Sequence, residues 1–154
     1  MTIAERVQQD MIAAMKAREE LRLSTLRMVK SALKMKEIDK RAPLADAEST
    51  QVLSTLIKQR REAIEQFTQG NRPELAAKEA AEIPIIEAYL PQMASAEQIA
   101  ASVQAAIAEI AASGTRPTAK DMGSVMKAVQ ARLQAANLRA DGKLVSDKVR
   151  AALA

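Results

Sequence analysis

The sequence lacks the residues from which many enzyme active sites and metal centres are built. Its 154 residues include no histidine, cysteine or tryptophan, with one phenylalanine, Phe67, and one tyrosine, Tyr89. Ser-His-Asp and Cys-His catalytic groups are therefore excluded, as are zinc sites that use His or Cys ligands. The absence of cysteine also excludes disulfide bonds, as is typical of proteins in a reducing compartment. We expect a cytoplasmic protein that is not an enzyme and that uses no cofactor and no metal.

Long hydrophobic runs are also missing. The most apolar stretch, residues 99–112, is interrupted by Gln104 and Glu109, so we expect no transmembrane helix. The first residues do not show the charged-then-apolar order of a signal peptide. These observations predict a soluble protein with no membrane partner.

Glycine is rare, and the four glycines are far apart. None lies in a G-x-x-x-x-G-K-[ST] pattern, so the chain has no recognisable ATP-binding loop. Glu79 and Glu82 lie three residues apart, and an earlier glutamate pair has the same spacing. A helical di-metal site would also require Glu-x-x-His motifs, which a chain without histidine cannot form. We interpret Glu82 as an ion-pair partner of Lys58 or Arg61. The carboxylates therefore indicate a structural role.

What the chain does contain is typical of helices. Ala, Leu, Lys, Glu, Gln, Arg and Met dominate, and no alternating run of β-branched or aromatic residues is long enough for a strand. Thr2-x-x-Glu5 and Ser95-x-x-Gln98 have the spacing of capping boxes. The pattern predicts helices over residues 3–16, 20–40, 46–69, 73–89, 96–112, 119–135 and 142–153. We expect Pro84 to bend or split the fourth helix, and Gly123 to mark a close helix crossing.

Two lobes follow from a break in the middle of the chain. Pro91 stops one helix and Ser95 caps the next, which places a boundary between residues 1–92 and residues 93–154. The short connection after residue 40 predicts a long helical hairpin in the first lobe. Three short amphipathic helices in the second lobe predict a small three-helix bundle. The expected fold class is all-α.

Positive charge is concentrated in one early segment. The formal net charge is +4, yet residues 22–41 alone carry seven basic and two acidic groups. At about 100° per residue, one side of this helix carries four basic residues: Arg27, Lys30, Lys34 and Arg41. Roughly opposite lie apolar residues: Leu21, Met28, Ala32 and Met35. The basic stripe should therefore face solvent, either as a footprint for an anionic polymer or as an ordinary solvated helix face.

The chain carries six segments whose order and spacing resemble a known family. They are Arg22–Met28, Leu56–Glu62, Ile85–Pro91, Asp121–Met126 with its M-G-x-V-M run, Arg139–Val145 with A-D-G-K-x-V, and the V-x-x-x-L ending at Leu153. The whole set resembles the YqeY proteins, and the last three segments resemble the tail domain of GatB, a component of the tRNA-dependent amidotransferases. The resemblance covers nearly the whole chain and implies an all-α protein with a tail-like second domain.

The resemblance implies a non-catalytic module associated with tRNA or with a tRNA-dependent enzyme. Candidate tRNA-binding residues in the tail are Lys127, Arg139 and Lys143, in addition to the basic stripe. With only two aromatic side chains, recognition would rest on phosphates and shape and not on base stacking. The counterpart of the amidotransferase catalytic domain is missing, so ligase activity would be inferred from the family name only.

Two alternatives remain open. In the first alternative, the chain is a helical protein–protein adaptor that does not bind RNA. In the second, it acts in trans as a component of a glutamine-dependent carbon–nitrogen ligase. Exposed Leu or Met beside the basic stripe would favour the adaptor. A continuous positive surface across both lobes would favour RNA.

Overall fold

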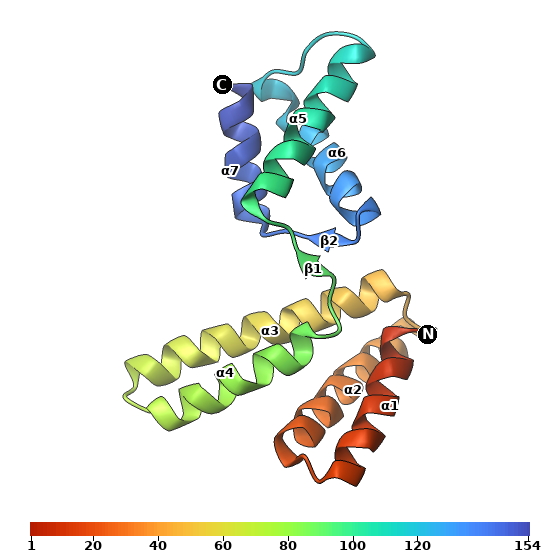
Figure 1. The fold of residues 1–154 in the computed structure, drawn as a ribbon, viewed down its shortest axis with the longest axis vertical. Coiled ribbons are helices and arrows are strands. Elements are labelled where there is room, and N and C mark those ends of the chain that lie inside the picture. Colours follow the sequence, from red (N-terminus) through yellow and green to blue (C-terminus); the bar gives the residue numbers. More distant parts are fainter. The chain divides into compact units, whose positions relative to one another are not determined.

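The computed structural model describes residues 1–154 as two compact helical units, Met1–Leu90 and Pro91–Ala154. Seven α-helices make up most of the chain (Figure 1). The all-α prediction is confirmed, and the predicted helix bounds agree with the structure to within two residues except at residues 119–121, which form a 3-10 turn. None of the helices combines the length and the apolar character needed to cross a membrane.

The first unit consists of four helices: α1 (Ile3–Ala17), α2 (Glu20–Lys40), α3 (Asp46–Gln69) and α4 (Pro73–Glu87). Figure 1 shows α1 lying along α2, and α3 lying along α4. The two long helices α2 and α3 are joined by a short connection, but each packs more extensively against its other neighbour. The core includes Val7, Leu26, Val29, Leu53 and Ile86, all buried.

Local capping sets the ends of the first helices. The Thr2 hydroxyl accepts a hydrogen bond from the Glu5 amide at 3.2 Å, and the Glu5 carboxylate accepts one from the Thr2 amide at 2.8 Å. This capping box satisfies two amide donors that the first turn would otherwise leave unpaired. At the C-terminal end of α2, Arg41 adopts the left-handed conformation with φ 60°. Its backbone N–H donates hydrogen bonds to carbonyls of the last turn. Arg41 therefore ends the helix and does not extend its face.

The second unit is a three-helix bundle with a minimal strand pair. Its elements are β1 (Gln92–Met93), α5 (Ala96–Ala112), the 3-10 turn η1 (Ala119–Asp121), α6 (Met122–Ala135), β2 (Leu138–Arg139) and α7 (Gly142–Leu153). Each of the three helices packs against the other two, around a core that includes Ile99, Val125 and Val149. β1 and β2 pair in parallel, with Gln92 opposite Leu138. This pair was not predicted, because two residues are too few for an alternating pattern.

One local expectation is wrong, and a second, that Pro84 bends or splits α4, is wrong for the split. A Cβ atom added at Gly123 would meet no other atom within 4 Å, so no helix crosses closely there. Gly123 is the second residue of α6 and is exposed. Pro84 does not split α4, which continues through it to Glu87. The proline removes one backbone donor, the bond to the carbonyl four residues earlier, and the helix continues without it.

Candidate functional site

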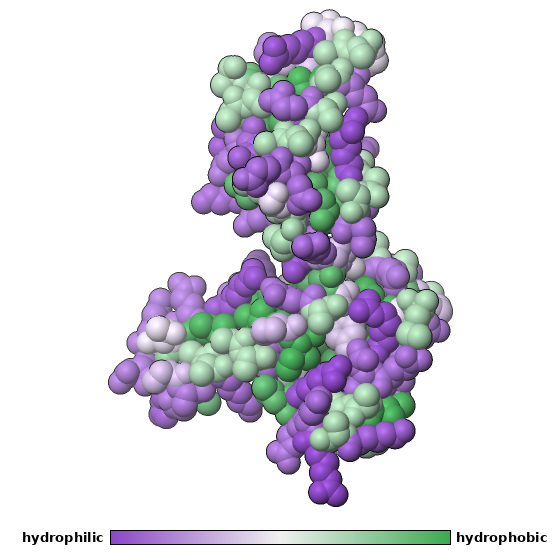
Figure 2. All heavy atoms as spheres, in the orientation of Figure 1, coloured by the Kyte–Doolittle hydropathy of each residue, from purple (hydrophilic) through white to green (hydrophobic).

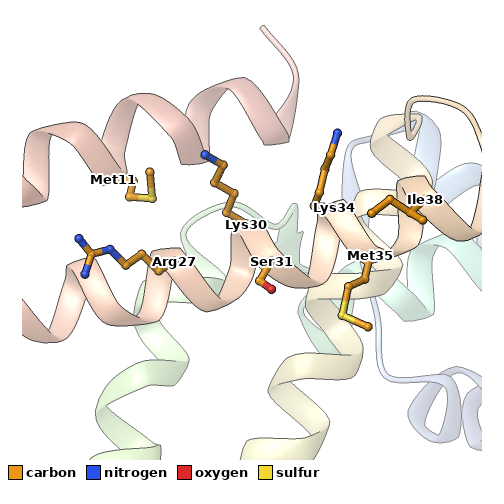
Figure 3. A pocket seen from close by; sticks show the side chains of 7 residues that line it. All are labelled: Met11, Arg27, Lys30, Ser31, Lys34, Met35 and Ile38. Carbon is orange, nitrogen blue, oxygen red and sulfur yellow. The ribbon is translucent and has the colours of Figure 1, made fainter.

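Three residues of the basic stripe line one open groove on α2. Arg27, Lys30 and Lys34 form part of the wall of a groove of about 520 Å³. The other lining residues are Met11 from α1 and Ser31, Met35 and Ile38 from α2. Figure 3 shows the charged ends of Lys30 and Lys34 extending to one side of α2, and Met35 projecting to the other. The groove therefore combines cationic and apolar side chains on one helix.

The apolar side chains beside the stripe are exposed. Met35 is 65% exposed and Ile38 is 64% exposed, and Leu21 and Met28 are also exposed. The expectation that Leu21, Met28 and Met35 form the side of the helix turned away from solvent is wrong. The buried face of α2 consists of Thr25, Leu26, Val29 and Leu33. Figure 2 shows the same property more widely, with apolar side chains reaching the surface of this unit between hydrophilic ones.

Sequence reasoning missed the groove because α2 carries two apolar series. Two apolar series on this helix have helical spacing: one at positions 21, 28 and 35, and one at positions 26, 29 and 33. Only packing decides which series is buried. A signal was nevertheless present in the sequence. Ile38 lies among lysines and acids, four residues after Lys34 and seven after Ser31. That spacing places an apolar side chain on the same face as the basic stripe.

The positive charges in the groove are largely uncompensated. Arg27 and Lys30 form no ion pair in the structure, whereas Lys34 Nζ lies 3.3 Å from Glu37 Oε2. An exposed pair of this kind contributes little stability, so it competes weakly with an incoming anionic group. The groove can therefore attract and bind carboxylates or phosphates.

The remaining predicted site residues lie elsewhere. Arg41 is in the turn after α2 and does not line the groove. In the second unit, Lys127 on α6 and Lys143 in the first turn of α7 are exposed and form no ion pair. Arg139 is half-buried in β2, and its Nε donates a hydrogen bond to the Pro91 carbonyl at 3.0 Å. That contact gives Arg139 a structural role in tying β2 to the start of the unit.

Glu82 has a structural partner, as expected, but a different one. Its Oε2 accepts a hydrogen bond from Arg60 Nε at 2.8 Å, whereas the sequence suggested Lys58 or Arg61. Both side chains are buried, with 6% of Arg60 and 10% of Glu82 exposed. A carboxylate held by a buried guanidinium has no access to a substrate. Glu82 is therefore excluded as a general acid or base.

The single tyrosine also has a structural environment. Tyr89 is buried, and its hydroxyl donates a hydrogen bond to Asp10 Oδ2 at 2.5 Å. The Arg6 guanidinium lies over the ring, 5.3 Å from its centroid. Burial and, after it, the hydrogen bond to Asp10 raise the pKa of Tyr89 well above its usual value. The phenol thus remains neutral, and Tyr89 is part of the core, as predicted, and not a stacking platform.

Neither the acidic side chains nor Ser24 form a recognisable site. No group of three or more acidic side chains is placed to hold a metal ion. The Ser24 hydroxyl donates a hydrogen bond to the Leu21 carbonyl at 3.1 Å. The groove on α2 is therefore the feature of the molecule that merits a functional account.

Comparison with known proteins supports the resemblance seen in the sequence. The family model described as "Yqey-like protein" matches residues 4–153, nearly the whole chain. The chain belongs to the YqeY-like family. The relationship of its second unit to the GatB tail domain stays a prediction.

Similar proteins of this family occur in yeasts. The chain is 36% identical to "Altered inheritance of mitochondria protein 41, mitochondrial" of Eremothecium gossypii, over 68% of this chain and 58% of that protein. The protein of the same name from Lachancea thermotolerans is 37% identical, over 75% of this chain and 63% of its own length. The protein of the same name from Kluyveromyces lactis is 42% identical, over 63% of this chain and 54% of its own length. The chain thus spans less than two thirds of these relatives.

The names of these relatives correct one expectation. They are called mitochondrial proteins, so the predicted cytoplasmic location is wrong. The prediction rested on the absence of cysteine and of a signal peptide. Neither feature separates one compartment inside the cell from another.

Proposed function

We propose that this YqeY-like protein is a non-catalytic adaptor whose N-terminal unit binds a partner protein. The observation that carries the proposal is the exposure of Met35 and Ile38 beside the basic residues of α2. Contiguous apolar side chains at the surface, rimmed by polar ones, mark interaction sites. Exposed apolar residues next to the stripe are also the feature that favours an adaptor over an RNA-binding protein.

The chemistry of the chain supports a binding role. Its buried titratable groups are engaged in structural contacts: Glu82 binds Arg60, and Tyr89 binds Asp10. The family description and the relatives' names include no catalytic activity. No residue of the chain supplies the nucleophile and base that an amidotransferase component would require.

A tRNA-associated role is the second candidate, and a specific observation favours it. Lys127 and Lys143 in the second unit, like Arg27 and Lys30 in the first, are exposed basic residues without ion pairs. Such side chains can neutralise phosphates. The second unit is also the part that resembles the amidotransferase tail. This candidate leaves the exposed apolar side chains of α2 without a role, so we place it second.

Capture of partners from a native lysate distinguishes the two candidates. The tagged full-length protein is incubated with lysate before and after ribonuclease treatment, and bound proteins are identified by mass spectrometry. The adaptor function predicts a reproducible protein partner that survives ribonuclease. If every specific partner is lost after ribonuclease and tRNA is recovered without it, the adaptor function is wrong and the tRNA role replaces it.

A further inference from the structure

We propose that the groove lined by Met11, Ser31, Met35 and Ile38 binds an acidic amphipathic helix of the partner protein. This inference rests on the proposed adaptor function and specifies both the docking surface and the chemistry of the partner.

The shape of the groove suits a helix. Its lining on α2 runs from Arg27 to Ile38, which corresponds to roughly 17 Å at 1.5 Å per residue. That length matches about three turns of a partner helix packed against α2. Ser31 is the smallest side chain in the lining, so it leaves room for a larger side chain of the partner. Docking of an amphipathic helix into an apolar groove is a recurrent mode of peptide recognition.

The apolar side chains provide the anchors. Met35 and Ile38 lie three residues apart on α2 and are both exposed, and half-buried Met11 contributes from α1. Methionine is flexible and polarisable, so it adapts to the side chains that a partner brings. A partner helix with Leu, Ile or Met at intervals of three and four residues would bury these groups.

Charge complementarity selects an acidic partner. Arg27, Lys30 and Lys34 line the groove alongside the apolar anchors, and the first two are unpaired. Asp or Glu residues flanking the apolar stripe of the partner would pair with them, which favours the acidic helix over a basic one. A nucleic acid would use the same cations but would leave Met35 and Ile38 in water. The combination therefore favours a protein helix.

The test uses the full-length protein and a defined probe. The probe is a fluorescent synthetic peptide of about five helical turns, or about 18 residues, with Leu at intervals of three and four and Glu on the flanks. One control peptide replaces each Glu with Lys, and another has the same composition in scrambled order. Binding is measured by fluorescence anisotropy at low salt. We expect the acidic amphipathic peptide to bind, and both controls to bind at least about tenfold more weakly, a difference of about 1.4 kcal/mol.

Matched protein variants locate the site. The double variant Met35→Gln/Ile38→Gln removes the apolar anchors, and Lys30→Glu reverses one charge. Because all three positions are exposed, the fold should be retained. The corresponding controls are Met15→Gln and Lys58→Glu, which change exposed residues outside the groove. We expect each groove variant to weaken peptide binding at least about tenfold, as for loss of an interface hot spot, and each control to change it less than about twofold. Circular dichroism of each variant verifies that the helices are intact.

Four results would overturn the inference. The acidic peptide fails to bind, or it binds the Met35→Gln/Ile38→Gln protein as tightly as the wild type. Alternatively, sedimentation shows a concentration-dependent dimer that the same variant abolishes, in which case a second copy of the chain occupies the groove. A partner protein captured equally by wild type and groove variant would leave the adaptor function in place and reject this surface alone.

Discussion

The buried guanidinium of Arg60 on α3 binds the carboxylate of Glu82 on α4 at 2.8 Å. The same guanidinium reaches α2, where its Nη2 lies 3.0 Å from the sulfur of Met28. One side chain therefore connects three helices of the N-terminal unit. Because α2 carries the groove, this contact also supports the surface to which we assign the function.

Loss of either partner of this pair should be strongly destabilising. We expect Glu82→Ala to lower the free energy of unfolding by about 3–5 kcal/mol, because it leaves a buried, uncompensated guanidinium. Glu74→Ala is the control, since the Glu74 carboxylate is exposed and lies 3.9 Å from Arg72; its effect should stay below about 1 kcal/mol. Urea denaturation monitored by circular dichroism measures both. Equal effects of the two substitutions would show that the buried pair does not hold the helices together.

The environment of Tyr89 predicts a loss of stability in alkali. Its pKa is raised in the folded protein, whereas in the unfolded chain it is about 10. Above about pH 10 only the unfolded chain ionises readily, so the contribution of Tyr89 to stability decreases as the pH rises. Tyr89→Phe should therefore be destabilising at neutral pH, and the difference from wild type should shrink above about pH 10. Urea denaturation of both proteins across this range provides the comparison.

Tyrosinate absorbance provides an independent check of the same group. Tyr89 is the only tyrosine and the chain has no tryptophan, so the signal reports this residue alone. We expect the native protein to show no tyrosinate at a pH where the urea-unfolded chain is already ionised. Ionisation at the same pH in both states would contradict the buried hydrogen bond to Asp10.

Gly123→Ala should stabilise the second unit. The added Cβ would meet no atom within 4 Å, and alanine gains up to about 1 kcal/mol over glycine in a helix. Gly70→Ala is the comparison, because its Cβ would lie 3.3 Å from the Gln66 carbonyl oxygen. Thermal unfolding should show a higher midpoint for Gly123→Ala than for wild type, and a smaller gain or a loss for Gly70→Ala. A destabilised Gly123→Ala protein would mean that the glycine has a role that packing does not show.

The tRNA candidate predicts a specific salt dependence. Each phosphate neutralised in a duplex-like region contributes about −0.9 to the slope of log K against log salt, so three or four contacts give roughly −3 to −4. Lys30→Glu with Lys34→Glu should reduce both the affinity for folded tRNA and this slope, with Lys58→Glu as the control. If the double variant and the control both bind tRNA as tightly as the wild type, the basic stripe does not contact RNA.

The helices were predictable because their signals are local. Thr2 with Glu5 and Ser95 with Gln98 form the capping boxes that their spacing predicted. Ser95 caps the start of α5 and Asp141 caps the start of α7, whereas α2 and α3 begin without a side-chain cap. Signals within one turn of the chain are sufficient for these elements, so packing did not need to be known.

The candidate site was less predictable because it depends on how helices rotate when they pack. The sequence indicated the basic stripe, but it did not reveal that Met35 and Ile38 would remain exposed beside it. Arg60 was missed for the same reason, although it lies three residues after Ile57 and so continues the buried series of α3. An arginine at a core position is identified only when its acidic partner on another helix is known.

Site-specific photo-crosslinking tests the central claim most directly. A photoreactive amino acid is placed at Ser31, within the groove, and at Gln59, which is exposed on α3 outside the groove. Both full-length proteins are irradiated in native lysate and the cross-linked species are identified by mass spectrometry. The account predicts one protein, cross-linked from position 31 through an acidic helical segment and not from position 59. Cross-links to RNA from position 31, or the same protein from position 59 alone, would contradict it.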